Sequence, residues 1–191
     1  MNAPNLNSRP SDTRPVDGKR RMLVGATAIA AGLVGVGAAW WRTQTPEHSP
    51  STPPADGFWT SEFDTPDGGK LAMRALQGHP LLVNFWATWC APCIEELPLV
   101  NDFYRQNRGN GWQVIGLAID KPAPVQAFLQ KTPLDFPIGM AGLSGAELSR
   151  GFGNLAGGLP FSVVLGSDGR VAQRKMGRLT PADLAGWLRL K

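Results

Sequence analysis

The chain has 191 residues, enough for one ordinary domain with an extension. Apolar residues make up 42% and charged residues 18%, a composition that supports a packed core and excludes a wholly disordered chain. Two cysteines are too few for a disulfide-rich mini-protein or for the four thiolates of an iron–sulfur cluster.

The net charge of +4 lies at one end of the chain. Residues 1–42 contain six Lys or Arg and two Asp, whereas residues 43–191 contain 13 basic and 13 acidic side chains. A domain that binds nucleic acid carries its basic residues within the folded part. This distribution therefore argues against a nucleic-acid partner and favours a targeting function for the N-terminus.

The N-terminal region has the pattern of a membrane-targeting segment. Residues 1–21 form a polar tail that ends in the basic run Lys19-Arg20-Arg21, and residues 22–41 follow without a charge. A helix of that length spans about 30 Å, the thickness of the hydrocarbon core of a bilayer. The basic run predicts a cytoplasmic tail with the rest of the chain outside. The segment is an uncleaved anchor, a cleaved secretory signal or a twin-arginine export signal, and all three deliver the remainder to the same side.

Residues 42–57 contain four prolines among serines and threonines and predict an extended linker. Residues 58–191 alternate predicted strands and helices. This alternation indicates an α/β domain whose central mixed sheet is flanked by helices.

The order of elements within residues 58–191 follows from periodicity and turn residues. The domain is predicted to open with a β-hairpin of strands 58–63 and 70–76, followed by a buried strand at 81–86 and a helix at 91–107. Further strands are predicted at 112–119, 136–140, 161–165 and 170–176, and further helices at 124–131, 145–152 and 181–190, the last capped by Thr180.

The motif Trp89-Cys90-Ala91-Pro92-Cys93 lies where the buried strand meets its helix. Unpaired N–H groups and the helix dipole stabilise a thiolate at a helix N-terminus, so we expect Cys90 to attack disulfides. We expect Cys93, one turn further on, to be shielded and to resolve the mixed disulfide. Pro92 suits the first helical turn, which needs no N–H from it.

A close cysteine pair can also form a structural disulfide or hold zinc, haem or copper. A structural disulfide across two residues closes too short a loop to stabilise much. A zinc site needs four ligands, and only His48 and His79 accompany the pair. A c-type haem site needs His where Ile94 stands. Two thiolates do suit Cu(I), so a Cu(I) metallochaperone is the second hypothesis. No metal or other cofactor is expected beyond the redox-active Cys90–Cys93 disulfide.

Residues 83–93 resemble the active-site strand and helix of thioredoxin-like proteins, and more closely those of the TlpA/ResA/CcmG group of membrane-anchored bacterial disulfide reductases. Residues 159–165, followed by Asp168-Gly169, are similar to the cis-proline strand and hairpin of that family. The predicted N-terminal hairpin and an insertion around residues 120–150, before the proline strand, are typical of this group. The resemblance implies a thioredoxin-like fold for residues 58–191.

The resemblance also implies roles for individual residues. Pro160 would follow a cis peptide bond and pack against the cysteines, and the Leu159 backbone would pair with an extended substrate. Trp89 would be a partly exposed contact surface, which makes Trp89, Pro92, Leu159 and Pro160 the predicted substrate-binding residues.

Two polar positions near the motif also follow the group. Asn84 stands where thioredoxin has a buried Asp, and Asn cannot take a proton. Glu96 matches a Glu of ResA-like proteins. We expect Glu96 either to tune cysteine acidity or relay protons, as a third catalytic residue, or to be an ordinary solvated helix carboxylate.

Together these observations predict a thiol–disulfide oxidoreductase that is held at the bacterial inner membrane by a single N-terminal span and faces the periplasm. Its expected task is to reduce disulfides in exported proteins, such as apocytochrome c during cytochrome c biogenesis or copper-site proteins. The resemblance implies a membrane thiol donor of the DsbD/CcdA type as partner. The redox direction stays open, because potential rather than fold sets it, and the same scaffold can instead form disulfides.

Overall fold

The structure is a computed structural model that describes residues 52–190. The predicted tail at 1–21, the apolar segment at 22–41 and the first part of the linker lie outside the described residues. Within residues 52–190, no helix combines the length and apolar character needed to cross a bilayer.

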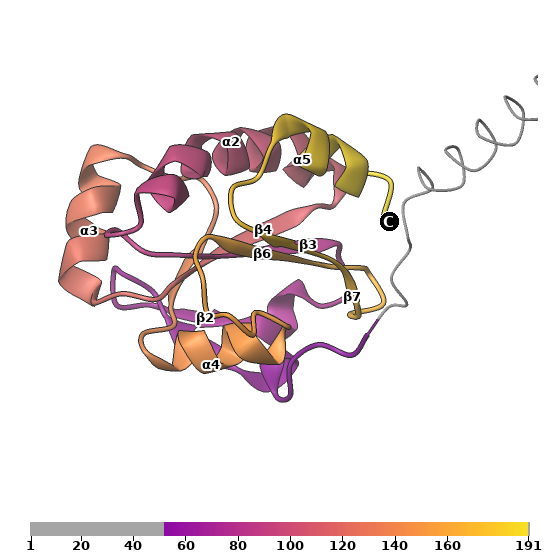
Figure 1. Cartoon of the computed structure of the whole chain (residues 1–191), viewed down its shortest axis with the longest axis horizontal. Coiled ribbons are helices and arrows are strands. Elements are labelled where there is room, and N and C mark those ends of the chain that lie inside the picture. The colour runs from indigo at the N-terminus through magenta and orange to yellow at the C-terminus, as the bar shows by residue number, and fades with distance from the viewer. Residues whose placement is uncertain (1–51, 191) are drawn as a thin grey trace, which may run out of the picture. The chain divides into compact units, whose positions relative to one another are not determined.

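A mixed sheet forms the centre of the fold (Figure 1), with seven strands in the described part of the chain. β3 runs parallel to β4 and antiparallel to β6, and β4 runs parallel to β5. The sheet order is β2-β1-β5-β4-β3-β6-β7, which confirms the predicted thioredoxin-like mixed sheet. The strands are β1 (Glu62–Asp64), β2 (Lys70–Ala72), β3 (Leu81–Trp86), β4 (Gln113–Ala118), β5 (Ile138–Met140), β6 (Phe161–Leu165) and β7 (Val171–Met176).

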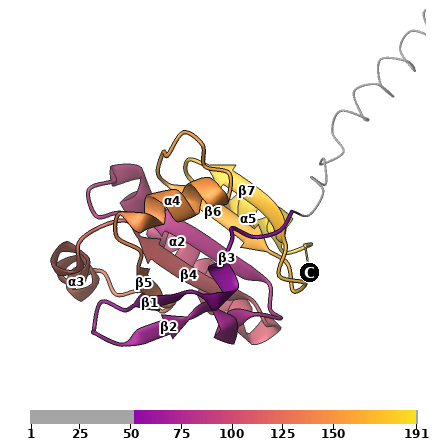
Figure 2. The same ribbon diagram turned by 90° about the horizontal axis from the view of Figure 1, so that it is seen from below.

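Helices cover both faces of the sheet. Figure 1 shows α2 and α5 on one side and α4 on the other, and Figure 2 shows α4 lying across the near face. The helices are α2 (Ala91–Asn107), α3 (Pro122–Lys131), α4 (Ser144–Gly151) and α5 (Pro181–Trp187), with short 3₁₀ turns η1 (Phe58–Thr60), η2 (Met73–Leu76) and η3 (Arg108–Asn110). The predicted helix at 91–107 is confirmed at both ends, and Thr180 caps α5 as expected.

Strand β3 is buried along its whole length, because both faces of the sheet are covered. Successive side chains of a strand point to opposite faces. Leu82 and Trp86 therefore join the core beneath α2 and α5, whereas Val83 and Phe85 join the core beneath α4. The same alternation places Asn84 on the α2 side, where the active-site helix passes over the sheet.

Two predicted boundaries are corrected. The hairpin strands are shorter than 58–63 and 70–76, because 3₁₀ turns at their outer ends direct Phe58 and Met73 into the core. The folded part also begins earlier than residue 58. Thr52 exchanges backbone hydrogen bonds of 3.2 and 2.8 Å with Val171, and Ala55 is buried. Residues 52–57, predicted as linker, therefore pack on the domain.

Candidate active site

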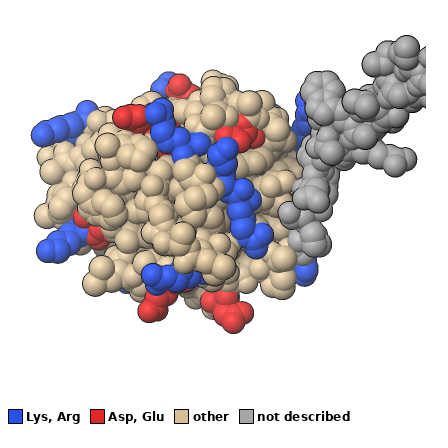
Figure 3. All heavy atoms as spheres, viewed as in Figure 1, with Lys and Arg blue, Asp and Glu red and all other residues tan. Residues whose placement is uncertain are grey.

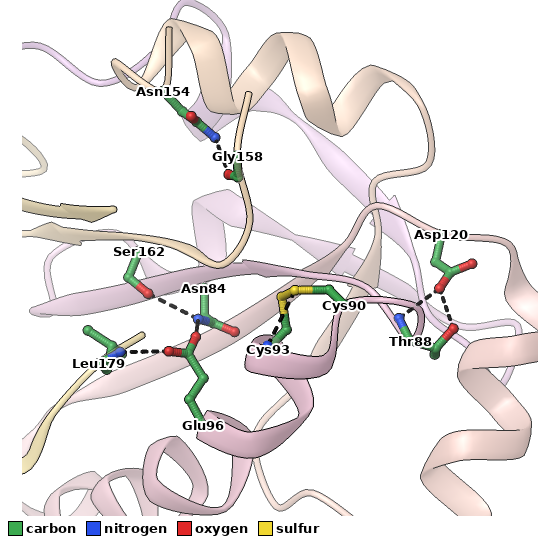
Figure 4. Close-up of a disulfide and its surroundings, with 10 residues drawn as sticks. All are labelled: Asn84, Thr88, Cys90, Cys93, Glu96, Asp120, Asn154, Gly158, Ser162 and Leu179. Carbon is green, nitrogen blue, oxygen red and sulfur yellow. Dashed lines mark hydrogen bonds between the residues drawn. A yellow bond between two sulfur atoms is a disulfide. The ribbon is translucent and has the colours of Figure 1, made fainter. Parts of the chain in front are cut away.

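The cysteine pair lies at the N-terminus of α2, directly after the loop that follows β3 (Figure 4). Cys90 is the N-cap residue, and its Sγ is joined to Cys93 Sγ at 2.06 Å with the Cα atoms 5.3 Å apart. The Cys93 N–H donates to Cys90 Sγ at 3.3 Å. This first-turn N–H is one of the groups that would stabilise a thiolate on Cys90 once the disulfide is reduced.

The two sulfur-bearing residues differ in exposure. Cys90 is 6% exposed and Cys93 is fully buried, whereas Ala91 and Pro92 between them face solvent. An incoming partner can therefore reach only the first cysteine of the oxidised pair. This asymmetry fits the predicted division between an attacking Cys90 and a resolving Cys93.

A carboxylate that the sequence analysis missed anchors the active-site loop. Asp120 lies just after β4, and its Oδ2 accepts hydrogen bonds from the N–H and the hydroxyl of Thr88 at 2.8 and 2.6 Å. Its Oδ1 accepts from the Lys121 N–H at 2.7 Å. Partial burial acts to raise the pKa of Asp120, but these hydrogen bonds outweigh it and hold the pKa below its ordinary value. An acidic residue directly after a buried parallel strand was the signal in the sequence.

Glu96 is buried rather than solvated. It is 1% exposed, and both carboxylate oxygens are bound: Oε1 accepts from Asn84 Nδ2 at 2.8 Å and Oε2 from the Leu179 N–H at 2.7 Å. The surface-carboxylate alternative is therefore wrong. Helical spacing explains the burial, because Glu96 follows the buried Cys93 by three residues and shares its side of α2.

Asn84 lies on β3 and links Glu96 to the neighbouring strand β6. Its Nδ2 also donates to Ser162 Oγ at 3.0 Å, and its Oδ1 has no hydrogen-bond partner although it is buried. Figure 4 shows the Asn84 amide between the Glu96 carboxylate and the disulfide. Burial raises the pKa of Glu96, and the hydrogen bonds from Leu179 and Asn84 and the charge of Arg178 only partly oppose this. A carboxyl group with a raised pKa therefore sits one turn from Cys93.

The predicted substrate-binding residues fall into two groups. Trp89 and Pro92 lie in the cysteine motif, and Trp89 is 68% exposed while Pro92 faces solvent. Pro160 directly precedes β6 and is buried, and Leu159 beside it is half-buried. The Leu159–Pro160 peptide bond is cis, as the resemblance implies, and the Pro160 carbonyl accepts from the Gly177 N–H at 2.9 Å.

Within residues 52–190, no group of three or more His, Cys, Asp or Glu side chains is placed to hold a metal ion. The chemistry that the described site supports directly is that of two cysteines which exchange a disulfide.

Comparison with known proteins agrees with this chemistry. Residues 52–186 match the Redoxin family. The thiol-disulfide oxidoreductase ResA of Bacillus thuringiensis (strain Al Hakam) is 32% identical over 124 residues, which cover 64% of this chain and 69% of that protein.

Solved structures of thioredoxin-like proteins are also similar to this chain. A thiol:disulfide interchange protein of the thioredoxin family from Chlorobium tepidum TLS is 27% identical with a TM-score of 0.62, covering 74% of this chain and 96% of that one. A thioredoxin-related protein from Neisseria meningitidis serogroup B is 28% identical with a TM-score of 0.57, covering 65% and 93%. The chain therefore belongs to the Redoxin family, as a thiol–disulfide oxidoreductase of the ResA type.

Proposed function

We propose that this oxidoreductase works as a reductase of disulfides in exported proteins, on the periplasmic side of a bacterial inner membrane. Residues 22–41 would tether it and the linker would hold residues 52–191 away from the bilayer. The observation that carries the thiol–disulfide chemistry is the asymmetric pair at the start of α2, where Cys90 caps the helix and Cys93 is fully buried. The reducing direction is proposed on the strength of the family resemblance. Apocytochrome c and copper-site proteins are the proposed substrates, on the strength of the family resemblance.

The reaction transfers two electrons from the enzyme to its substrate. The Cys90 thiolate attacks one sulfur of the substrate disulfide, which breaks that bond and releases the other sulfur as a thiolate. The Cys93 thiolate then attacks Cys90 Sγ, forms the intramolecular disulfide and releases the second substrate thiol. The enzyme is left oxidised, and a membrane thiol donor of the DsbD/CcdA type is the proposed source of the next electron pair. No cofactor other than the cysteine pair takes part.

Glu96 is the proposed proton acceptor for the resolving step. Cys93 must lose its proton before it can attack, and its burial opposes a negative charge there. Glu96 has a raised pKa and is joined to the Asn84 amide, which itself cannot take a proton. Glu96→Gln should slow the resolving step and shift the ultraviolet thiolate titration of the reduced pair. Glu95→Gln, an exposed neighbour paired with Arg178, is the matched control and should shift neither.

Trapping experiments test the division of labour between the cysteines. In the full chain, Cys93→Ser should accumulate a mixed disulfide with a disulfide substrate, because nothing resolves it, whereas Cys90→Ser should trap little. Equal trapping by the two variants would contradict the assigned roles.

The reduction potential of the Cys90–Cys93 pair tests the direction of the reaction. Equilibration of the full chain with glutathione or dithiothreitol buffers should give a value near or below that of thioredoxin, about −270 mV. A value near that of DsbA, about −120 mV, would mean that the protein forms disulfides and would remove the proposed substrates. Stoichiometric Cu(I) retention without disulfide exchange would instead identify a metallochaperone.

A further inference from the structure

A pocket of about 500 Å³ opens beside the active-site loop, between the segment that follows β4 and the segment that precedes α4. Trp89 and Leu143 line it together with Ile119 and Pro122. Trp89 is 68% exposed and Leu143 is 92% exposed. Single exposed apolar residues are common on protein surfaces, but two large ones that share a pocket next to a reactive sulfur mark an interaction surface.

Hydrogen bonds hold the walls of this pocket to the active-site loop. The Ala118 carbonyl accepts from the N–H groups of Ala141 and Gly142 at 3.0 and 3.1 Å, which ties the Leu143 wall to the end of β4. The Ile119 N–H donates to the Trp86 carbonyl at 2.8 Å, and Asp120 binds Thr88. These hydrogen bonds hold the backbone of the pocket walls in place, so a bound group does not have to order that backbone.

The pocket adjoins the reactive site along the chain, because Trp89, which lines it, directly precedes Cys90. A substrate joined to Cys90 Sγ by a mixed disulfide is held against this loop. An extended chain advances about 3.3 Å per residue, so a side chain one or two residues from the substrate cysteine reaches about 3 to 7 Å from it. Asp120 and the exposed Lys121 also line the pocket. The Asp120 carboxylate is occupied by three hydrogen bonds, so we assign the recognition of an apolar side chain to Trp89, Ile119, Pro122 and Leu143.

We propose that this pocket, here called the Trp89 pocket, binds a large apolar side chain that lies within two residues of the substrate cysteine. The inference rests on the proposed reductase function and names its substrate class: extended polypeptide segments in which a leucine-like or aromatic residue accompanies the cysteine. Leu143 is a specificity-determining residue of this pocket. It acts through contact with the substrate chain and not on the sulfur chemistry.

Two synthetic peptides test the proposal. Each is a disulfide-linked homodimer with one cysteine per strand, and the two differ only in a leucine or a serine directly after that cysteine. The reduced full chain in lipid nanodiscs is mixed with each dimer in a single turnover. One enzyme dithiol becomes a disulfide while one peptide dimer becomes two thiols. Burial of the leucine side chain should raise the second-order rate constant about tenfold over the serine peptide.

Two variants of the protein test whether the preference for the leucine peptide comes from the Trp89 pocket. Leu143→Ser should reduce the leucine-to-serine ratio to about threefold or less, since it removes one apolar wall. Leu155→Ser is the matched control, because Leu155 is 83% exposed and lies outside the pocket lining. It should leave the ratio near tenfold. Use of a ratio cancels any common effect of a variant on the cysteine chemistry.

Each contrary outcome has a distinct meaning. Equal reduction of the two peptides would overturn the Trp89 pocket and leave the reductase function standing. Reduction of neither peptide would overturn the reductase function and the pocket with it. A similar fall of the leucine-to-serine ratio in both variants would contradict the pocket, because it would show that exposed apolar residues in general cause the preference. If sedimentation finds a dimer of the full chain that Leu143→Ser dissociates, a second copy fills the pocket and the proposal fails.

Discussion

Asn84 donates its amide N–H to Glu96 across 2.8 Å, at a place where both side chains are almost completely buried. An amide beside a carboxylate is compatible with either protonation state of the acid, because it offers both a donor and an acceptor. The Asn84 Oδ1 has no hydrogen-bond partner. If the side-chain amide flips, this oxygen can accept a hydrogen bond from a protonated Glu96. The pair therefore accommodates a change in the protonation of Glu96 without a second buried charge.

Glu96→Gln should remove a pH dependence of folding. The pKa of Glu96 is raised above 4.5 in the folded protein, so the folded state holds this proton more tightly than the unfolded chain does. The resulting stabilisation is present below pH 4.5 and is lost as the pH rises through the folded pKa. Urea unfolding of the wild type should show this loss, and Glu96→Gln should not. Glu95→Gln should retain the wild-type profile, and a flat wild-type profile would count against a raised pKa.

Asn84→Asp should destabilise the fold more strongly at pH 8 than at pH 5. The change places a second carboxyl group against Glu96 in a buried site, and two such groups cannot both ionise without a large cost. We expect a loss of about 3 kcal/mol in the free energy of unfolding at the higher pH. At the lower pH a protonated acid can donate to its neighbour, which restores part of the stability.

Asn101→Asp is the matched control for that variant. Asn101 donates to the Asp135 carboxylate at 2.9 Å, but this pair lies at the surface. Solvent screens the new repulsion there, so we expect a loss of less than about 1 kcal/mol. Comparable losses in the two variants would show that burial of the Asn84–Glu96 pair has no energetic consequence.

Asp120→Asn should loosen the loop that carries Trp89 and Cys90. The pKa of Asp120 is held below 3.8, so its contribution to stability is present above that pH and is lost as the pH falls through the folded pKa. Near neutral pH we expect a loss of about 1 kcal/mol, which should disappear in strong acid. Thr88→Ser keeps both hydrogen-bond donors and should behave as the wild type. Thermal unfolding as a function of pH measures both variants.

Phe58→Ala should cost about 3 kcal/mol, because the Phe58 side chain is buried in the core. The Phe58 ring packs edge to face on Phe152 with centroids 5.0 Å apart, and Phe152 in turn contacts Phe85 of β3. Leu155→Ala, at an exposed position, should change stability by less than about 0.5 kcal/mol. Denaturant unfolding of the full chain gives both values, and a negligible loss at Phe58 would show that its ring does not contribute to the core of the folded unit.

Local patterns were sufficient to predict the parts of the fold that long apolar runs define. The buried strand at 81–86 and the helix at 91–107 appear as expected, because each has a strong periodicity and a clear boundary residue. The hairpin strands were too long in the prediction. Their outer residues are apolar enough for a strand, but Phe58 and Met73 turn into the core through contacts with residues distant in sequence.

The site was predictable to the same extent. Cys90 and Cys93 follow from their motif, and the cis bond before Pro160 follows from the family resemblance. The hydrogen bond that Glu96 accepts from the Leu179 N–H, in contrast, joins residues 83 positions apart. The contact of Asp120 with Thr88 likewise spans 32 residues. No local pattern reports such pairings, because the sheet order alone brings those segments together.

Charged side chains on the face seen in Figure 3 include acidic and basic groups with wide areas of other residues between them. Such a surface gives less charge repulsion between molecules than a highly charged one does. Exposed edge strands therefore need another feature that prevents pairing with a strand of a second molecule.

Strand β7 is an edge strand, and its free backbone groups are a template on which a strand of another molecule can form. The bridge from Thr52 occupies this template at Val171, and Arg174 reinforces it with a hydrogen bond to Thr52 Oγ1 at 2.6 Å. The segment that leads into the domain thus covers the β7 edge at Val171. Proteolytic removal of that segment would expose the β7 edge and shorten the lifetime of the protein in solution before any loss of cysteine chemistry.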